Sequence, residues 1–389
     1  MDRINRAPAP DVSTVLRDVS SARGLPNAHY TDADVFKRER DAVLFRNWSG
    51  IGFAKDVPKP GFVKPVTFLG MPLLIVRDRD GSLRVFQNTC RHRGMILVDA
   101  PGHLRGVIRC PYHSWCYGLD GRLKVTPHVG GPGINTHAAL DISTLGLIQI
   151  RSHVWMGVVF VNVDGQAPAF EQAHAPLLER WSEFDKPLHA GGAAASFTLD
   201  VATNWKLAVE NYCESYHLPW VHPGLNSYSR LEDHYNIIER GAYSGQGTYV
   251  YRQIKGDRGE MLTDFAGLSE KWETGAEYIA VYPNVLLGVQ RDQTFAIVLD
   301  PVDCERTIER IALFYAAPVT ADLEALADRN AAQWKQVFKE DVFVVEGMQR
   351  GRHGVHFDGG RFSPAMDGPT HNFHHWVAAQ VQSHAGAAV

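Results

Sequence analysis

Two closely spaced Cys and His pairs constrain this chain more than any other feature of its sequence. Cys90 and His92 are separated by one residue, Cys110 and His113 by two, and seventeen residues lie between the pairs. Each pair follows an apolar, strand-like segment, so two loop tips can converge on one centre. Because thiolates and imidazoles together suit zinc or an iron–sulfur cluster better than magnesium or calcium, the pattern predicts a metal centre built on two loops.

Hairpin signals surround these loops. Asp80-Gly81 and Asp120-Gly121 each stand between short apolar segments, an arrangement typical of tight turns in β-hairpins. We therefore expect a small antiparallel β domain over residues 46–165. Ahead of it, residues 1–45 are expected to form a Pro-containing arm and a helix for which Thr31 and Asp32 are candidate N-caps.

Length, charge and cysteine usage bound the remaining possibilities. With 389 residues the chain exceeds the size at which one hydrophobic core stops growing, so two domains are expected. The formal net charge of -4 argues against nucleic acid as the main partner. The N-terminus has no apolar run of signal-peptide length, and no later window approaches the roughly 20 apolar residues of a membrane span, which predicts a cytoplasmic protein. In that reducing compartment, an odd total of five cysteines favours metal binding over a disulfide framework.

Residues 166–389 differ from the preceding β domain in composition and in hydrophobic pattern. A Gly, Ala and Pro-rich crossing with one short amphipathic helix, PLLERWSEF, leads into strand-like segments such as TFAIVLDPVD and RIALFYAAPV. Helices are expected around NWKLAVENYCESYH and from about residue 321 to about residue 348. The chain as a whole is therefore predicted to be of the α+β class, with a second domain that combines strands and helices.

The mixed composition of the two loops separates the candidate metals further. Zinc typically takes paired cysteines and paired histidines, whereas a Rieske 2Fe-2S cluster holds one iron with two thiolates and the other with two imidazoles. The C-x-H and C-x-x-H loops resemble a Rieske domain, which makes Cys90, His92, Cys110 and His113 the expected cluster ligands. A structural zinc site is the alternative.

Residues beside the ligands refine this resemblance. Rieske proteins of respiratory complexes carry an extra cysteine in each loop, but Met95 and Tyr112 occupy those positions here, so the cross-cluster disulfide cannot form. The segment CPYHSW is similar to the CPYHGW of oxygenases, with Ser114 in place of the commoner Gly. Cys116, just past the loop, is expected to be a packed core thiol.

A second cluster of polar residues opens the second domain, in NWKLAVENYCESYHLPWVHPGLNSYSR. Asn204 is a candidate cap for a helix that runs to about His217. On such a helix Glu210, Asn211, Glu214 and His217 lie on roughly one face. The pattern therefore predicts that these polar side chains point inward together.

Two imidazoles in this segment suggest a second metal. Pro219 ends the predicted helix, and His222 can turn back from the following loop toward His217. Two imidazoles and one carboxylate form the facial triad of non-haem Fe(II) oxygenases. For the carboxylate, three acids of the C-terminal helix compete: Glu340, Asp341 and Glu346.

The pattern N-W-K, E-N-Y, E-x-Y-H and a second His five residues on resembles the α subunit of Rieske non-haem iron oxygenases, the aromatic-ring-hydroxylating dioxygenase family, over roughly residues 40–351. The resemblance implies a helix-grip catalytic domain, an antiparallel sheet with helices, whose mononuclear Fe(II) is bound by His217 and His222. The family's E-x-x-Q-x-G ending fixes the third ligand at Asp341. Glu214 becomes the acid that links one subunit's cluster to its neighbour's iron, and Asn211 joins it as a catalytic-site residue. A Glu at the linking position is similar to the choline, glycine betaine, stachydrine and carnitine oxygenases.

The resemblance also implies how such an enzyme works. The chain has no flavin or nicotinamide motif, so a separate reductase or ferredoxin supplies electrons from NAD(P)H through the cluster to the iron. Dioxygen then either cis-dihydroxylates an arene or hydroxylates one carbon, which beside nitrogen results in N-demethylation. A small ammonium-type substrate is favoured, and its identity stays open. The family forms a head-to-tail homotrimer, with or without a β subunit, and an electron carrier without oxygenase activity is the alternative.

Two further groups of residues have open roles. Five aromatic residues near the second motif are candidates for a cation–π cage, for stacking on an arene, or for the core: Tyr212, Tyr216, Trp220, Tyr228 and Tyr235. The three histidines of HNFHHW near the C-terminus are expected at the surface rather than at a metal.

Overall fold

The computed structural model describes residues 10–387, which divide into two compact units. One unit comprises Gly50–Gln166. The other joins the described part of residues 1–49 to that of residues 167–389. The N-terminal segment therefore packs in the same unit as the second half of the chain.

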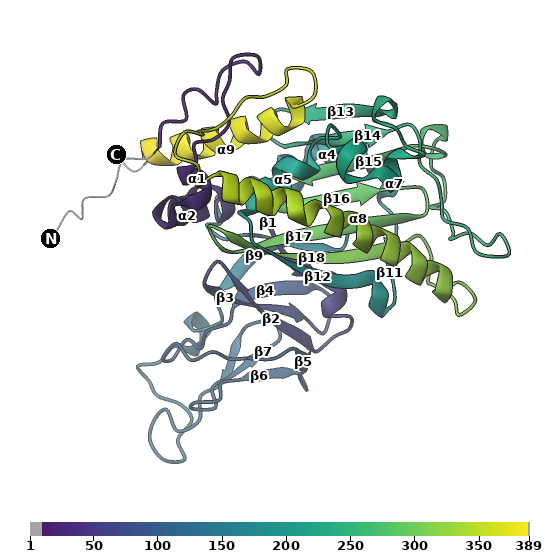
Figure 1. The fold of residues 1–389 in the computed structure, drawn as a ribbon. Helices are drawn as coiled ribbons and strands as arrows, with labels where there is room; N and C mark the ends of the chain where they lie inside the picture. Colours follow the sequence, from purple (N-terminus) through teal and green to yellow (C-terminus); the bar gives the residue numbers. More distant parts are fainter. Residues whose placement is uncertain (1–9, 388–389) are drawn as a thin grey trace. The chain divides into compact units, whose positions relative to one another are not determined.

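The Gly50–Gln166 unit is built of antiparallel strands in two sheets (Figure 1). A 7-stranded sheet has the order β1-β10-β9-β4-β3-β2-β5, and a 3-stranded sheet has the order β6-β7-β8. Asp80-Gly81 lies between β3 and β4 and Asp120-Gly121 between β7 and β8, with φ of 83° and 81° at the two glycines, as predicted for tight turns. The strands are β1 (Ser49–Phe53), β2 (Phe62–Phe68), β3 (Met71–Arg77), β4 (Leu83–Gln87), β5 (Gly102–His103), β6 (Val107–Arg109), β7 (Cys116–Gly118), β8 (Leu123–Val125), β9 (Gln149–Trp155) and β10 (Val158–Asn162).

The other unit contains an 8-stranded antiparallel sheet of order β11-β18-β17-β16-β15-β14-β13, with β12 pairing with β18. The first half of β17 is buried residue after residue, which is why TFAIVL forms a continuous apolar run. The strands are β11 (His189–Ala190), β12 (Ser196–Val201), β13 (His234–Glu239), β14 (Tyr243–Thr248), β15 (Ala276–Val281), β16 (Val285–Val289), β17 (Gln293–Asp303) and β18 (Arg306–Tyr315).

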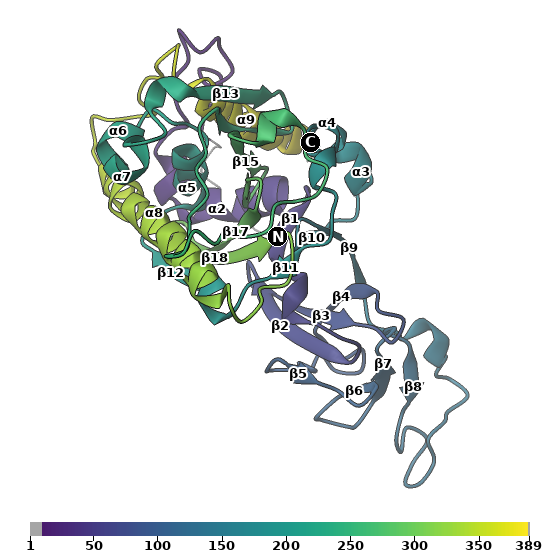
Figure 2. The ribbon, with the colours of Figure 1, turned by 90° about the vertical axis from the view of Figure 1, so that its right-hand side faces the viewer.

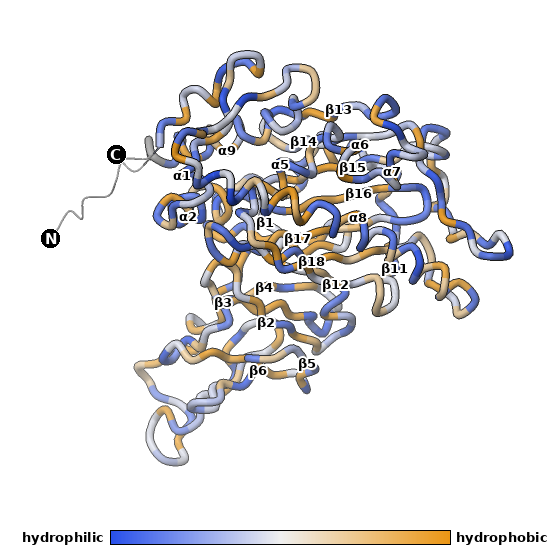
Figure 3. The backbone as a smooth tube through the Cα atoms, viewed as in Figure 1, coloured by the Kyte–Doolittle hydropathy of each residue, from blue (hydrophilic) through white to orange (hydrophobic). Residues whose placement is uncertain are grey.

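Three helices pack against this sheet: α5 (Trp205–Tyr212), α8 (Glu324–Gly351) and α9 (Gly368–Ala387) (Figures 1 and 2). The apolar strands between β15 and β18 stand out against the hydrophilic outer loops of this unit (Figure 3). The short helices are α1 (Ala28–Thr31), α2 (Ala33–Glu39), α3 (Phe170–Ala173), α4 (Ala175–Arg180), α6 (Leu218–Val221) and α7 (Pro223–Asn226). The predicted α+β class, with an antiparallel β unit ahead of a sheet-and-helix unit, is confirmed.

The helix expected from Asn204 to about His217 is shorter than predicted. Asn204 caps α5 by accepting from the Lys206 N–H (3.1 Å), but the helix ends at Tyr212. The Glu214 carboxylate then accepts the backbone N–H groups of Tyr216 and His217, so these amides are used in a turn rather than in a continued helix.

The prediction that the HNFHHW histidines lie at the surface is wrong for one of them. His374 is buried on α9, where its Nδ1 accepts from the Leu25 N–H (2.9 Å) and its Nε2 lies 3.2 Å from Glu210. Neighbouring Phe373 and Trp376 pack this helix face inward. A histidine on an apolar helix face can be buried when an acidic side chain in the core pairs with it.

Candidate metal centres

The two Cys-His loops of the β unit have the same backbone design. In the first, the Cys90 N–H donates to Met95 O (2.8 Å) and the Gly94 N–H to Cys90 O (3.0 Å). In the second, the Cys110 N–H donates to Trp115 O (2.8 Å) and the Ser114 N–H to Cys110 O (3.1 Å). Each loop needs a residue of positive φ at the same place, which is Gly94 (75°) in one and Ser114 (58°) in the other. Ser114 therefore holds a backbone conformation that favours glycine.

The side chains of these loops gather two thiols and two imidazoles. Cys90 and Cys110 are buried and not in a disulfide, and they belong to one hydrophobic core cluster. Burial raises the pKa of the Cys90 thiol, and the neighbouring Cys110 thiol acts in the same direction. The His92 and His113 ring centroids lie 4.7 Å apart. His113 Nδ1 is buried without a hydrogen-bond partner, as expected of a nitrogen whose lone pair binds a metal. These residues fit a Rieske cluster.

Three further residues lie beside the ligands of the two loops. Cys116 is buried, as predicted for a core thiol, and its Sγ donates to Ser114 O (3.2 Å). Met95 and Tyr112, which occupy the positions of the extra cysteines, are exposed to 41% and 55%. All five cysteines of the chain are free.

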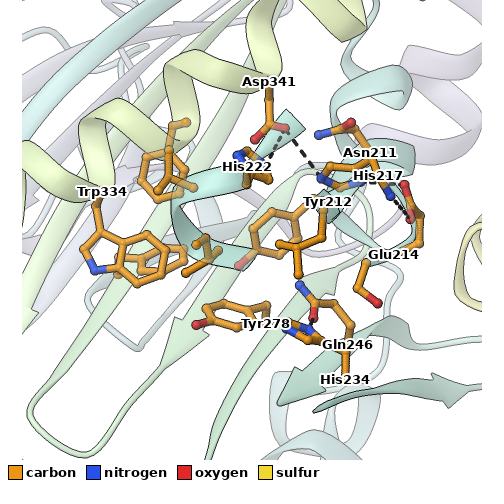
Figure 4. Close-up of a pocket in the computed structure, with 16 residues that line it drawn as sticks. Asn211, Tyr212, Glu214, His217, His222, His234, Gln246, Tyr278, Trp334 and Asp341 are labelled. Carbon is orange, nitrogen blue, oxygen red and sulfur yellow. Dashed lines mark hydrogen bonds and ion pairs between the residues drawn. The ribbon is translucent and has the colours of Figure 1, made fainter. Parts of the chain in front are cut away.

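In the second unit, three side chains from three local structures converge. His217 stands at the N-cap of α6, His222 lies between α6 and α7, and Asp341 lies on α8. Their ligand atoms all lie within 4.8 Å of one another. His222 Nε2 is 3.0 Å and His217 Nε2 is 3.6 Å from Asp341 Oδ1 (Figure 4).

A carboxylate at the far side of each imidazole sets its orientation. His217 Nδ1 donates to Glu214 Oε1 (2.7 Å), and His222 Nδ1 donates to Glu340 Oε2 (2.9 Å). With each ring proton on Nδ1, the lone pair of each Nε2 faces Asp341. Asp341 Oδ1 accordingly is buried with no hydrogen-bond partner despite the two nitrogens beside it. The lone pairs of the two Nε2 atoms and of Asp341 Oδ1 therefore face one another, and an acid orients each imidazole from behind. This arrangement fits a bound divalent metal ion.

The electrostatic field at this point favours a positive charge. Burial lowers the pKa of His222, but Asp341 and Glu340 outweigh it and raise the pKa above its ordinary value. Of the three acids that competed in the sequence, only Asp341 belongs to the group of ligand atoms among the described residues. Glu340 faces the back of His222, and Glu346 accepts from the Ala202 N–H (3.1 Å).

Glu210 does not join the other polar residues of its segment, contrary to the predicted shared face. It accepts from the Tyr30 hydroxyl (2.5 Å) and lies 3.5 Å from Arg352 and 3.2 Å from His374. Burial raises the pKa of Glu210, but His374, Arg352 and Tyr30 outweigh it and lower the pKa. Because α5 ends at Tyr212, Glu214 does not continue the helical face of Glu210. Glu210 points to this separate buried network, while Asn211 and Glu214 line the pocket beside the triad.

A pocket with a cavity volume of about 60 Å³ lies beside the triad. Its walls away from the triad are aromatic (Figure 4). Trp334 lies 4.7 Å from Phe295 and 5.6 Å from Phe338 between ring centroids, and Tyr278 lies 6.0 Å from Trp334. Among the described residues that line it, none is Lys or Arg. The lining residues are Asn211, Tyr212, Glu214, Ser215, His217, Leu218, His222, Leu225, His234, Gln246, Tyr278, Phe295, Trp334, Val337, Phe338 and Asp341.

The aromatic candidates near the sequence motif have other positions, with one exception. Tyr212 lines the pocket, with its hydroxyl donating to Leu287 O (2.8 Å). Tyr216 and Trp220 are exposed to 43% and 71%, and Tyr235 donates to Glu277 (3.0 Å). Tyr228 is absent from the described pocket lining. The spacing of Trp334, Phe338 and Asp341 at i, i+4 and i+7 could have revealed the α8 wall from sequence.

The fold and the two donor sets define an iron-dependent oxygenase that receives electrons through a Rieske cluster. Two family models match the chain: the Rieske 2Fe-2S domain over residues 47–141, and the ring hydroxylating alpha subunit (catalytic domain) over residues 188–383. The chain therefore belongs to the Rieske non-haem iron oxygenases of the ring-hydroxylating α-subunit family, as its sequence motifs predicted. Members are oxidoreductases that carry a Rieske cluster and a mononuclear iron.

Individual relatives agree with this assignment. The carnitine monooxygenase oxygenase subunit of Acinetobacter pittii is 26% identical over 337 residues, covering 84% of each chain. The chloroplastic choline monooxygenase of Beta vulgaris is 26% identical over 368 residues, covering 92% of this chain and 77% of that one. A solved quaternary ammonium Rieske monooxygenase shares the fold with a TM-score of 0.78 at 22% identity, covering 97% of this chain and 100% of its own. Naphthalene 1,2-dioxygenase from Rhodococcus sp. shares it with a TM-score of 0.74 at 18% identity, covering 97% and 99%.

No helix among the described residues is both long and apolar enough to cross a membrane.

Proposed function

We propose that this chain oxygenates a carbon beside the nitrogen of a small organic ammonium compound and so removes an N-alkyl group. The observation that carries the proposal is the charge of the pocket: its lining includes Glu214 and Asp341, aromatic walls, and no Lys or Arg among the described residues. Such a lining attracts a cation through the ring faces and offers no Lys or Arg side chain to an anionic group. The carnitine and choline monooxygenases among the relatives support the same class of substrate.

The mononuclear iron is assigned to His217, His222 and Asp341, and the cluster to Cys90, His92, Cys110 and His113. When bound, the two groups supply electron transfer and O₂ activation. Glu214 and Glu340 keep the two imidazoles in the tautomer that presents Nε2 to the metal. Tyr212 is fixed by its bond to Leu287 O, and together with Phe338 it walls the pocket beside Asp341. These apolar walls exclude bulk water from the reacting carbon.

Electron delivery requires a partner in this proposal. A separate reductase or ferredoxin reduces the cluster, and the chain assembles as a head-to-tail homotrimer, with or without a β subunit. Glu214 links one subunit's cluster to the next subunit's iron, because its carboxylate already holds His217 and is 14% exposed. Asn211, which lines the pocket beside it, is assigned to the same catalytic group.

A cis-dihydroxylating arene dioxygenase is the second candidate. The facing rings of Phe295, Trp334 and Phe338 could stack on an aromatic substrate as well as on a cation. The naphthalene dioxygenase structures share the fold. The two candidates differ in their product, which is an aldehyde plus a dealkylated amine in one case and a diol in the other.

The test begins with metal analysis of anaerobically purified protein. About three irons and two sulfides per chain are expected, whereas zinc without sulfide would contradict both metal assignments, and two irons would leave an electron carrier. The loaded enzyme, with a ferredoxin reductase system and NADH, is then offered choline, carnitine, hexyltrimethylammonium and naphthalene. Formaldehyde release with matching O₂ consumption supports N-demethylation, and diol formation from naphthalene with no formaldehyde from the ammonium compounds favours the second candidate.

A further inference from the structure

An unusual group of buried polar atoms lies at the hairpin between β16 and β17. Five of the twelve buried side-chain N and O atoms that have no hydrogen-bond partner in the described chain belong to residues 290–294. They are both amide atoms of Gln290, Oδ2 of Asp292, Oε1 of Gln293 and Oγ1 of Thr294. None of these four side chains is more than 1% exposed. A buried polar group without a partner is unfavourable by about 1–3 kcal/mol, so a cluster of them indicates a ligand or ordered water.

The strand register places part of this group on the pocket side of the sheet. Gly288 of β16 pairs with Tyr278 on one side and with Phe295 on the other, and both aromatic residues line the substrate pocket. Two residues further on, Gln290 and Gln293 face one another, with the Gln290 N–H donating to Gln293 O (2.9 Å). Since side chains alternate along a strand, Gln290 and Gln293 share the face of Tyr278 and Phe295 at a step of about 7 Å. Thr294, which lies between Gln293 and Phe295 on β17, points to the opposite face of the sheet.

Contacts with Tyr278 connect the group to the pocket wall. Burial raises the pKa of the Tyr278 hydroxyl, and the adjacent Gln290 amide opposes that rise. In Figure 4, Tyr278 and Trp334 lie on the side of the pocket away from Glu214. The Gln290–Gln293 hairpin therefore lies beyond the aromatic walls, at the end of the pocket remote from the metal triad.

The neighbours of Asp292 leave one carboxylate oxygen free. Oδ1 accepts from the Tyr251 hydroxyl (2.8 Å), which in turn accepts from Gln293 Nε2 (3.3 Å). The Gln253 amide beside Asp292 donates to Leu262 O (3.3 Å) and Asp264 (2.7 Å) and also lowers the pKa of Asp292, and Arg291 pairs with Asp264. Burial raises the pKa of Asp292 to about 6, so the carboxyl is mainly ionised at neutral pH. Within the described part of the chain no Lys or Arg forms an ion pair with it, since neighbouring Arg291 pairs with Asp264.

We propose that Gln290, Asp292 and Gln293 form the polar end of the substrate pocket and bind a hydrogen-bond donor, a hydroxyl or a protonated amine, at the end of the substrate remote from the oxidised carbon. The free atoms are mostly acceptor oxygens, which match a donor and repel a carboxylate. Trp334 stands seven residues before Asp341 on α8, about 10 Å along the helix, so the substrate is elongated. The inference rests on the proposed function, because it assigns the second end of the same pocket.

Binding to the loaded, anaerobic, full-length enzyme tests the inference by calorimetry with four ligands of one length. The probes are hexyltrimethylammonium, its 6-hydroxy and 6-amino derivatives, and 6-(trimethylammonio)hexanoate. The hydroxy and amino probes should bind at least about tenfold more tightly than the plain hexyl probe, and the carboxylate should bind most weakly. Equal affinities in the wild type, or no binding of any probe, would overturn the inference without any variant.

Variants then locate the preference. Asp292→Asn should remove most of the advantage of the amino probe, and Gln290→Leu most of that of the hydroxy probe. The matched control is Thr294→Val, which removes a partnerless hydroxyl from the same hairpin but on the opposite face, and should preserve both preferences. If the amino and hydroxy probes keep their affinity advantage in Asp292→Asn and Gln290→Leu, the inference is overturned. Water molecules alone would then be the hydrogen-bond partners of these buried atoms.

Turnover of the same probes separates this inference from the proposed function. Discrimination among the probes without formaldehyde release supports the polar end and contradicts N-demethylation. Formaldehyde release without discrimination supports N-demethylation and contradicts the polar end.

Discussion

Replacing Tyr117 by Phe should lower the reduction potential of the Rieske cluster. Tyr117 is fully buried in the β unit, and its hydroxyl lies 3.3 Å from Cys90 Sγ. The same hydroxyl oxygen accepts the Arg91 N–H (3.0 Å), so its own proton is free to point toward the sulfur. Burial raises the pKa of Tyr117, and the hydroxyl therefore stays a donor at neutral pH.

The size of the effect follows from the charge on the sulfur. Reduction adds one negative charge to the cluster, so a hydrogen bond to a ligand thiolate stabilises the reduced state more than the oxidised state. A hydrogen bond to a charged group contributes about 1.5–3 kcal/mol, and roughly half of that is expected as the difference between the two states. For one electron, 59 mV corresponds to about 1.4 kcal/mol. The potential should therefore fall by about 30–60 mV.

Spectroelectrochemical titration of the visible absorbance measures this potential, with sulfide analysis to show that the cluster is intact. The matched control is Tyr112→Phe in the neighbouring loop, whose hydroxyl accepts from Arg93 (3.3 Å) and is 55% exposed. That variant should shift the potential by less than about 10 mV. A Tyr117→Phe potential equal to or higher than that of the wild type would refute the donor assignment.

Three further predictions follow from the other sites. Asp341→Ala should lose about one iron per chain while keeping sulfide and colour, whereas Glu340→Ala should keep the iron and bind it about 10–100-fold more weakly; equal iron contents in the two variants would contradict the assigned ligand. Ser114→Gly should raise stability by about 1 kcal/mol in thermal melts, because Ser114 has a φ of 58°, and Gly94→Ala should do the reverse. Glu39→Gln should cost about 3–5 kcal/mol in urea unfolding, because it leaves the buried Lys206 ammonium, 2.6 Å away, without its partner. Burial raises the pKa of Glu39, but Lys206 and His29 outweigh burial and lower the pKa below its ordinary value. The ionised carboxylate therefore stabilises the fold above pH 4.5, and this stabilisation is lost as the pH falls below that value. If stability falls with acid to the same extent in Glu39→Gln as in the wild type, this assignment is contradicted.

The sequence predicted best where chemistry depends on local spacing. The Cys-His loops and the Asp-Gly turns are each contained in a few residues, and the hairpins form as expected because local turn preference and strand pairing agree. His217 and His222 are five residues apart, so a single turn brings them together. Asp341 came from the register of a family motif rather than from spacing, because 118 residues separate it from His222.

The sequence predicted least where a residue has two possible partners. Glu210 matched the helical face of Glu214, yet it pairs with Arg352 and His374, whose positions depend on how α8 and α9 pack. The pocket aromatic residues Tyr278 and Phe295 depend in the same way on strand register across Gly288. Neither long-range packing nor register is contained in one local stretch of chain.

Glu214 shows how one carboxylate can serve three tasks without conflict. An ionised carboxylate has about four acceptor positions. Oε1 accepts from His217 Nδ1 (2.7 Å), and Oε2 accepts the two backbone N–H groups that end the α5 segment in a turn. One position on Oε1 stays open, on a side chain that is 14% exposed. That remaining position can accept one imidazole N–H from another subunit, so the same side chain that shapes the turn and orients the iron ligand also has the capacity for the inter-subunit link proposed above.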